Sequence, residues 1–397
     1  MRIDLKRKDS NLGPGTGKIV GNKVSIVIPT HNRASLLRCA LSCAQSQTLR
    51  DKEIVVVVDG STDDTLSMLE AHFPEVKVVH HETPRGPSAA RNAGIAAASG
   101  DWIFFHDDDD LMHPSHLAEL LAATLAAPPK SLVAGRSRDF AVLGNDVVFG
   151  PPIWTAAERP DTDTLIQFLE PTALRTLTHT TILWPRRLFD TEKWDETLSF
   201  YEDFDLCGRA ILSGLHVIGR EVGMYYIRVH AAPRLTSAQD DTNQLLWAAR
   251  FWLKWATILR DRPEHRACAE ALRNGLMDCL IRLSNLPAGQ SCLPQLAAAF
   301  REWGGERYYV TPRPGTPLKR TIGDAVLNVA GFRTLHLLLD VAEALRRKEK
   351  PYLDRLQAPA NEADRQDALY IGNYEAEVGL QAASVRSRPT MASRASR

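Results

Sequence analysis

Apolar residues in the first third of the chain follow two alternating periods. The runs VSIVIP at 24–29 and EIVVVV at 53–58 are rich in β-branched residues and predict buried strands. Residues 34–45 and 64–73 carry apolar positions at the three- and four-residue spacing of a helix. Buried strands that alternate with helices indicate a mostly parallel sheet with helices on both faces. We therefore expect an α/β fold.

The same alternation continues and then becomes mixed. Strands at 76–81 and 101–105 and helices at 88–99 and 114–127 extend the pattern to Pro128. Beyond it, candidate strands and short helices mix up to about residue 230. Ligands bind beyond the carboxyl ends of the strands in such sheets, so polar residues at those ends are candidate site residues.

Later segments differ in composition, and they give the expected domain organisation. Residues 240–300 have helical periodicity, whereas the last residues are rich in Ser, Ala and Arg. The expected segments are a flexible leader at 1–22, an α/β domain at 23–235, a helical C-terminal region at 236–350 and a partly disordered tail at 351–397.

Charge and cysteine content narrow the class of protein. Lys+Arg and Asp+Glu both total 48, so no overall positive field argues for a nucleic-acid partner. The six cysteines form no C-x-x-C pair and are expected to be reduced. The chain has neither a signal-like apolar run at its start nor a stretch of about 18 apolar residues. These features favour a cytoplasmic protein.

Four adjacent carboxylates, Asp107–Asp110, follow the strand at 101–105. Their mutual repulsion costs free energy, which suggests that something positive belongs beside them. Hard cations such as Mg²⁺ and Mn²⁺ prefer carboxylate oxygens. If the segment stays extended, Asp107 and Asp109 share a side and Asp108 points away. The alternative is a solvated acidic turn that caps the next helix.

Asp59 ends a second predicted buried strand, in VVVVDGSTDDT. A carboxylate there can accept a hydrogen bond from an N–H group such as the imide of a pyrimidine. The following Ser61, Thr62 and Asp63 fit the cap of the next helix, and both roles are compatible because they use different side chains.

Four segments together resemble a family 2 glycosyltransferase of the GT-A fold, over roughly residues 23 to 230. They are VSIVIPTHNRASLLRCALSCAQSQT, EIVVVVDGSTDDT, GPSAARNAGIAAASGDWIFFHDDDD and SFYEDFDLCGRAILSG. The resemblance implies a Rossmann-like, mixed and mostly parallel sheet sandwiched by helices, followed here by the C-terminal helical region. It also implies transfer of a sugar from a nucleotide diphosphate donor, usually a UDP-sugar, with inversion at the anomeric carbon and a divalent metal, Mn²⁺ or Mg²⁺.

The resemblance also assigns roles to single residues. The residues that it implies in nucleotide binding are Pro29, Thr30, Asn32, Arg33, Asp59, Arg85, Arg91, Asn92, Asp107 and Asp108. Within this set Asp59 would contact the uracil and Asp107 the ribose. Asp109 would be the metal ligand. The family commonly has two acids before the glycine of the DGS segment, and here Val58 replaces the first.

The segment YEDFD resembles the family's Glu-Asp motif and makes Asp203, with Glu202 beside it, the candidate catalytic pair. An inverting displacement needs one carboxylate to take the acceptor's hydroxyl proton, and a metal offsets the charge of the leaving diphosphate. The alternative is a helix N-terminus that favours acids. His230 lies where some relatives have a metal-ligating histidine, and a structural role is equally open.

Two other functions remain open at this stage. A sugar nucleotidyltransferase would need a glycine-rich, basic loop after the first strand, which PTHNRASLL does not supply. A catalytically silent module that binds a nucleotide or a glycan would keep the same fold. The acceptor is expected to be a glycan or a lipid-linked molecule in polysaccharide assembly. The C-terminal helices could pack on the catalytic domain, form a homodimer interface, or lie peripherally on the inner face of a membrane.

Overall fold

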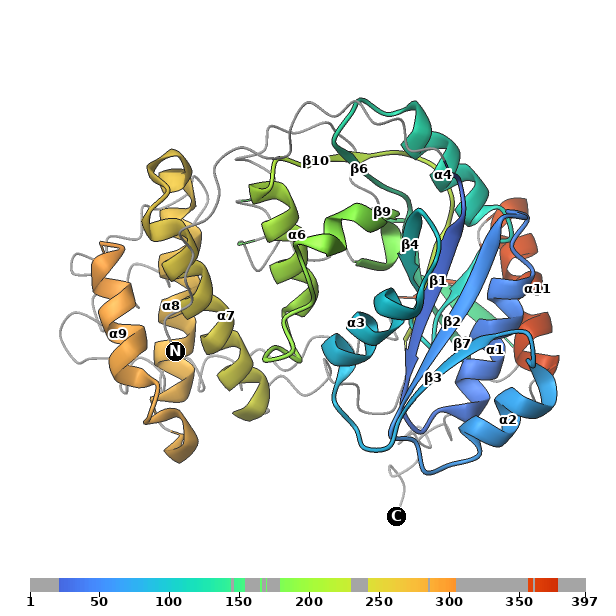
Figure 1. Cartoon of the computed structure of the whole chain (residues 1–397), viewed down its shortest axis with the longest axis horizontal. Helices are drawn as coiled ribbons and strands as arrows, with labels where there is room; N and C mark the ends of the chain where they lie inside the picture. Colours follow the sequence, from blue (N-terminus) through green and yellow to red (C-terminus); the bar gives the residue numbers. More distant parts are fainter. Residues whose placement is uncertain are drawn as a thin grey trace, which may run out of the picture.

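The computed structural model shows an α/β body beside a group of C-terminal helices (Figure 1). The residues that the structure describes are 21–143, 146–153, 165, 169, 179–229, 242–284, 286–304, 356–359 and 361–377.

The central sheet has the strand order β3-β2-β1-β4-β9. Its strands are β1 (Val24–Thr30), β2 (Lys52–Asp59), β3 (Lys77–His81), β4 (Trp102–Phe105) and β9 (Trp184–Pro185). The first four in chain order are parallel, and β9 is antiparallel to β4. Side chains of β1 alternate between two cores: Val27 packs in the same core as Ile95, and Ile28 in the same core as Leu37. The continuous apolar pattern of β1 therefore reflects burial on both faces.

Helices cover both faces of this sheet (Figure 1). They are α1 (Ala34–Gln45), α2 (Thr65–His72), α3 (Pro87–Ala97) and α4 (His116–Ala126). Helix α3 begins where Gly86 takes φ +92° and Pro87 fills the first helical position. A Cβ at Gly94 would lie 2.3 Å from Val27, so the missing side chain lets α3 approach β1 closely.

A second sheet begins directly after the aspartate tetrad. Its strands, in the order β5-β11-β7-β8, are β5 (Leu111–Met112), β11 (Tyr225–Arg228), β7 (Ser137–Leu143) and β8 (Asp146–Phe149). A parallel pair is formed by β6 (Ser131–Ala134) and β10 (His216–Gly219). The 3₁₀ helices η1 (His179–Thr181) and η2 (Arg186–Asp190) and helix α6 (Glu202–Leu212) complete this body.

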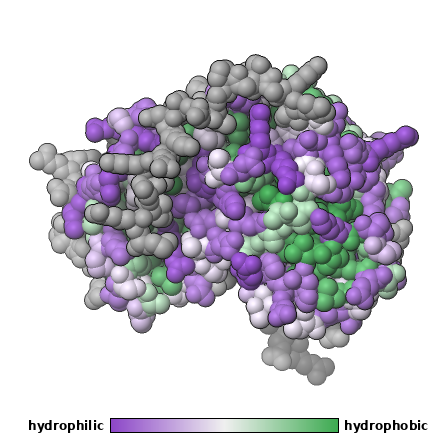
Figure 2. Space-filling view, in the orientation of Figure 1, coloured by the Kyte–Doolittle hydropathy of each residue, from purple (hydrophilic) through white to green (hydrophobic). Residues whose placement is uncertain are grey.

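The C-terminal region is helical and packs on the α/β body. Its elements are α7 (Thr242–Arg260), η3 (Pro263–Cys268), α8 (Ala269–Leu283), η4 (Pro287–Gly289) and α9 (Leu293–Glu302). Trp255 of α7 is fully buried, and a Cβ at Gly208 of α6 would lie 2.4 Å from its ring. The coloured surface of these helices in Figure 2 is mostly hydrophilic, because their large apolar residues face inward.

A further helix, α11 (Glu362–Glu377), lies in the segment that we expected to be a partly disordered tail. It packs against β8 and α1 at the far side of the body from α7 (Figure 1). Arg138 of β7 pairs with Asp364, and the Tyr370 hydroxyl donates to the carbonyl oxygen of Met112 at 3.0 Å. This part of the expected tail is therefore folded onto the second sheet.

The predicted fold class is confirmed: the chain is a mixed α/β protein with mostly parallel strands, flanked by helices and followed by C-terminal helices. Among the described residues, no helix is both long and apolar enough to cross a membrane.

Candidate active site

Three strand ends meet at one edge of the central sheet because β1, β2 and β4 are parallel. The first strand ends at Pro29 and Thr30, and the second at Asp59. Strand β4 is followed by His106 and then by the tetrad Asp107–Asp110. The sheet thus brings the predicted motifs to the same edge.

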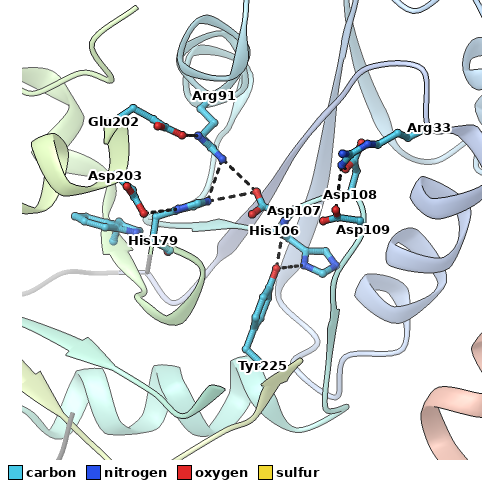
Figure 3. A network of polar contacts seen from close by, with 11 residues as sticks. Arg33, Arg91, His106, Asp107, Asp108, Asp109, His179, Glu202, Asp203 and Tyr225 are labelled. Carbon is cyan, nitrogen blue, oxygen red and sulfur yellow. Dashed lines mark hydrogen bonds and ion pairs between the residues drawn. The ribbon is translucent and has the colours of Figure 1, made fainter. Parts of the chain in front are cut away.

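The tetrad forms a turn instead of continuing as an extended strand. Asp108 is buried and accepts hydrogen bonds from Thr30 Oγ1 at 2.7 Å and Arg33 Nη1 at 2.8 Å. The same Arg33 nitrogen lies 3.1 Å from Asp109 Oδ2 (Figure 3). The expectation that Asp107 and Asp109 share a side, with Asp108 pointing away, required an extended segment and is wrong, because Asp108 and Asp109 share one guanidinium.

Asp107 faces a different set of groups, on the other side of the turn. Its Oδ1 lies 3.2 Å from Arg91 Nη2 and 3.3 Å from His179 Nε2. Burial alone raises the pKa of Asp107, but the charges and hydrogen bonds of His179 and Arg91 outweigh it and hold that pKa well below its usual range. Asp107 therefore stays ionised.

Strand β11 supports the turn from behind. The backbone N–H of Arg228 donates to Asp110 Oδ1 at 2.8 Å, and its Nε donates to the carbonyl oxygen of Asp109 at 2.6 Å. The Tyr225 hydroxyl accepts from the N–H of Asp107 at 3.2 Å and pairs with His106 Nδ1 at 2.9 Å. These bonds fix the backbone on which the carboxylates sit.

The chain itself thus supplies positive groups beside the tetrad, chiefly Arg33 and Arg91. These positive groups do not fully offset the cost of burying the Asp108 carboxylate. Burial and the neighbouring Asp109 raise the pKa of Asp108 to about 6, although Arg33 and Thr30 act in the opposite direction. The protein therefore tolerates the charge of Asp108 less well than that of Asp107.

Asp59 holds the loop that leads into α3. Its carboxylate accepts hydrogen bonds from the backbone N–H groups of Arg85 at 3.0 Å and Gly86 at 2.8 Å, and His81 Nδ1 lies 2.7 Å away. A carboxylate has about four lone-pair sites, and these contacts use both oxygens. The contact with a uracil stays a prediction.

Of the other predicted nucleotide-binding residues, Asn32 and Arg85 lie in loops that follow strands, whereas Asn92 lies on helix α3. Asn32 takes φ +53° and joins two strand ends, because its Oδ1 accepts from the N–H of Thr62 at 2.7 Å. Arg85 is half exposed and pairs with Glu196. Asn92 instead forms two hydrogen bonds with the backbone of Trp194. Its Nδ2 donates to the carbonyl oxygen at 2.9 Å, and its Oδ1 accepts from the N–H at 3.0 Å. Asn92 is thus engaged in structure, not aimed at the tetrad.

Glu202 and Asp203 open helix α6 and are connected to the tetrad. Arg91 Nη1 donates to Glu202 Oε1 at 3.1 Å, and His179 Nδ1 lies 3.7 Å from Asp203 Oδ2 (Figure 3). Burial and the adjacent Asp203 raise the pKa of Glu202, and Arg91 opposes them. The predicted catalytic pair and Asp107 therefore belong to one polar network.

Helix α7 supports the start of α6 from the C-terminal region. Tyr201, just before Glu202, takes φ +65°, a left-handed conformation that is uncommon for a bulky residue. Phe251 stacks on its ring with centroids 5.0 Å apart. Lys254 pairs with Asp195 at 2.6 Å and with the fully buried Asp205 at 2.8 Å. The position of the candidate base thus depends on the C-terminal helices.

Two residues of this network were not identified from the sequence. His179 and Trp194 flank Arg91, whose guanidinium carbon lies 4.6 Å above the indole ring. Both are far from the tetrad in sequence and carry no motif of their own. His230, for which a metal-binding role was open, lies outside the described residues.

A divalent metal fits the donor chemistry of the tetrad. Hard cations take carboxylate oxygens, and Mg²⁺ commonly uses one or two of them together with phosphates of the substrate. The described residues include no preformed group of three or more His, Cys, Asp or Glu side chains that could hold a metal alone. A site completed by substrate oxygens is consistent with both observations.

Part of the chain is similar in sequence to known glycosyltransferases. Residues 25–190 match the sequence model of "Glycosyl transferase family 2". A "PGL/p-HBAD biosynthesis glycosyltransferase" of Mycobacterium bovis is 36% identical over 115 residues, 28% of this chain and 45% of the relative. The "GalNAc(5)-diNAcBac-PP-undecaprenol beta-1,3-glucosyltransferase" of Campylobacter jejuni is 36% identical over 103 residues, 25% of this chain and 33% of the relative. These matches therefore span less than half of either relative.

The solved structures agree on the fold. S. aureus TarS 1-349, in a complex with UDP-GlcNAc, superposes with a TM-score of 0.53 at 20% identity, covering 86% of this chain and 97% of TarS 1-349. The superposition shows a GT-A type fold, and residues 25–190, less than half of the chain, resemble the family 2 glycosyltransferases.

Proposed function

We propose that this protein transfers a sugar from a nucleoside diphosphate donor to a hydroxyl group of an acceptor, with inversion at the anomeric carbon. The observation that carries the proposal is the network in which Arg91 and His179 join Asp107 to Glu202 and Asp203. It links a carboxylate cluster suited to a diphosphate and its cation with a carboxylate suited to deprotonate an acceptor.

The donor would bind at the strand ends. Thr30 and Arg33 contact the tetrad, and Pro29 and Asn32 belong to the same strand end and loop. We propose a uridine donor, with Asp59 toward the base and Asp107 and Asp108 on the ribose side. The complex of TarS with UDP-GlcNAc, a protein of the same fold, supports a nucleotide-sugar donor.

A divalent cation, Mn²⁺ or Mg²⁺, would be held by Asp109 together with the donor's diphosphate. When bound, it would offset the negative charge that develops on the leaving diphosphate. Two arginines of this chain that contact the tetrad would act in the same sense. Arg33 contacts Asp109, and the buried Arg91 contacts Asp107.

The reaction needs one base and one leaving group. Asp203 would take the proton of the acceptor hydroxyl as that oxygen attacks the anomeric carbon from the face opposite the diphosphate. The bond between that carbon and the diphosphate oxygen breaks, and its electron pair leaves with the nucleoside diphosphate. The products are a glycoside of inverted configuration, the nucleoside diphosphate, and a proton on Asp203.

The acceptor is proposed to be a glycan or a lipid-linked glycan. The support is the name of the C. jejuni relative, a glucosyltransferase whose acceptor is linked to undecaprenol. The tyrosine and phenylalanine side chains at 200–201, next to the proposed base, are half-buried and could border such an acceptor.

The test is release of nucleoside diphosphate from a panel of UDP-, GDP- and dTDP-sugars, with and without Mn²⁺. We expect metal-dependent release from one donor, and a loss of about 10²-fold or more in kcat for Asp203→Asn. Asp109→Ala should lose the metal dependence together with the activity. Asp190→Asn, an exposed aspartate of η2, is the matched control and should behave as the native chain. Nucleotide binding without release from any donor, with a panel of glycan acceptors present, would contradict the proposal.

A further inference from the structure

His179 is held rigidly between the two halves of the site. It is 6% exposed, and its ring makes edge contacts with Phe105, at a centroid distance of 6.3 Å, and with Trp194, at 5.4 Å. Its carbonyl oxygen accepts from Trp184 Nε1 at 3.2 Å. The backbone and the ring are therefore both fixed, and the two ring nitrogens point in defined directions.

The contacts of Nε2 determine where the ring carries its proton. Arg91 Nη2 lies 3.1 Å from Nε2, and a guanidinium can only donate hydrogen bonds. Because Arg91 Nη2 is nearer to Nε2 than Asp107 Oδ1 is, at 3.1 Å against 3.3 Å, we infer that Nε2 accepts in a neutral ring and that the proton sits on Nδ1. In a protonated ring both nitrogens carry a proton, and Nε2–H faces Asp107 at 3.3 Å. With this tautomer, Nδ1 is a donor in both the neutral and the protonated ring.

That donor faces the proposed base. Nδ1 is buried and has no hydrogen-bond partner among the described residues. The carboxylate oxygen Oδ2 of Asp203 lies 3.7 Å from it, which is longer than a hydrogen bond. The other oxygen of Asp203 accepts from the N–H of Phe204 at 2.9 Å. A small rotation of the Asp203 side chain would bring Oδ2 onto Nδ1 and fix the plane of the carboxylate from two sides.

We propose that His179 is a positioning residue for Asp203: its Nδ1–H orients the carboxylate toward the acceptor hydroxyl, while its Nε2 contacts Asp107 on the donor side. The inference rests on the proposed function, because it assigns a partner to the proposed base. Burial and Arg91 lower the pKa of His179, but Asp107 and Asp203 outweigh them and raise it, in agreement with a ring that faces both carboxylates. The contact with Asp107 would couple the occupied donor site to the orientation of the base.

Three variants distinguish a role of His179 in positioning Asp203 from a role in packing alone. In His179→Asn the side-chain amide lies near the place of Nδ1, in His179→Gln it lies near the place of Nε2, and His179→Phe keeps the ring volume without a donor. We expect kcat to fall about a hundredfold in the Gln and Phe variants, as a misplaced catalytic group does. The kcat of the Asn variant should be about tenfold higher than that of the Gln and Phe variants. The KM for the donor should change little in all three. Equal losses in all three, or best activity in the Phe variant, would show that His179 only fills space.

A readout without turnover tests the geometry separately. Histidine ring ¹⁵N NMR of the full chain, with the His179 signals assigned by their loss in His179→Asn, reports the protonation of each nitrogen. We expect a protonated Nδ1 at neutral pH, with a resonance that shifts in Asp203→Asn and stays unchanged in the control Asp190→Asn. A bare Nδ1 with a protonated Nε2 would overturn the inference. Failure of the proposed function would instead appear as no release by the native chain from any donor.

Discussion

The donor side and the base side of the site are built in different ways. The tetrad is anchored by the ends of parallel strands, by Arg33 and Arg91, and by β11 behind it. Glu202 and Asp203 sit on one helix, α6, which follows a residue with positive φ and leans on α7. The family match covers residues 25–190 and stops before α6. The donor side is thus held within the α/β body, and the base side depends also on the packing of the C-terminal helices.

Arg91 joins the two sides, so its loss should have the largest effect. Arg91→Met leaves the carboxylates of Asp107 and Glu202 without their buried cation, and we expect unfolding free energy to fall by about 3–5 kcal/mol. Arg85→Met is the matched control, because Arg85 is 53% exposed in its side chain and should cost less than about 0.5 kcal/mol. Denaturant unfolding of both variants measures the difference, and equal losses would show that the network holds little of the fold.

Two glycines in helices test how far the base side depends on α7. Gly208→Ala should destabilise the protein by about 1–3 kcal/mol, because the new Cβ would lie 2.4 Å from the Trp255 ring. Gly372→Ala in α11 meets nothing within 4 Å and should stabilise the protein by about 0.5–1 kcal/mol. Thermal unfolding should therefore show a lower melting temperature for Gly208→Ala and a higher one for Gly372→Ala than for the native chain.

The effect of Gly208→Ala on function sharpens the comparison further. Because α7 supports the helix that carries Asp203, this variant should lower kcat more than it lowers affinity for UDP. An equal loss of both, measured by turnover and by calorimetry, would mean that α7 supports the donor side as well.

His116 is a buried histidine that packs on the strand leading into the tetrad. Its ring lies against Phe104 and Tyr225, and burial, with the charges of His106, His113 and Arg136, lowers its pKa to about 3. Between about pH 6.5, where the unfolded histidine titrates, and pH 3, the unfolded state binds a proton that the folded state does not. Stability should therefore fall as the pH falls, by about 1.4 kcal/mol per pH unit for this group.

A variant isolates this contribution. Denaturant unfolding between pH 6.5 and 4.5 should show a smaller pH slope in His116→Phe than in the native chain. A slope that is the same in both proteins would mean that His116 does not titrate on unfolding in this range.

A small destabilisation is expected in α11, which contacts Met112 of β5, directly after the tetrad. Tyr370→Phe removes the hydrogen bond to the carbonyl oxygen of Met112 and should cost about 1 kcal/mol. Tyr374→Phe on the same helix removes an exposed bond to Ser46 and should cost less. If unfolding experiments reverse that order, α11 does not support the segment after the tetrad in the way described.

The alternation of strands and helices up to residue 126 could be predicted because it follows from the local spacing of apolar residues. The turn of the tetrad could not, because Thr30, Arg33 and Arg228 determine its conformation from three separate elements. The contact between His179 and Asp107 joins positions 72 residues apart, and no local pattern encodes it.

Helix α11 was missed for a different reason. The compositional argument for a tail rested on the Ser-, Ala- and Arg-rich residues 380–397, and the apolar positions of 362–377 give only a weak helical stripe. Its place is set by partners distant in sequence, such as Arg138 for Asp364 and Met112 for Tyr370. Such pairs can be found only once the second sheet is known.

A structure of the full chain with UDP and Mn²⁺ would test the central claim most directly. The claim is that the tetrad and Asp203 serve one transfer reaction. We predict that the diphosphate and the cation lie beside Asp109, with the carboxylate of Asp203 open to the same space and His179 Nδ1 within hydrogen-bond distance of it. Nucleotide bound away from the strand ends, or bound there with no cation on the tetrad, would contradict the account.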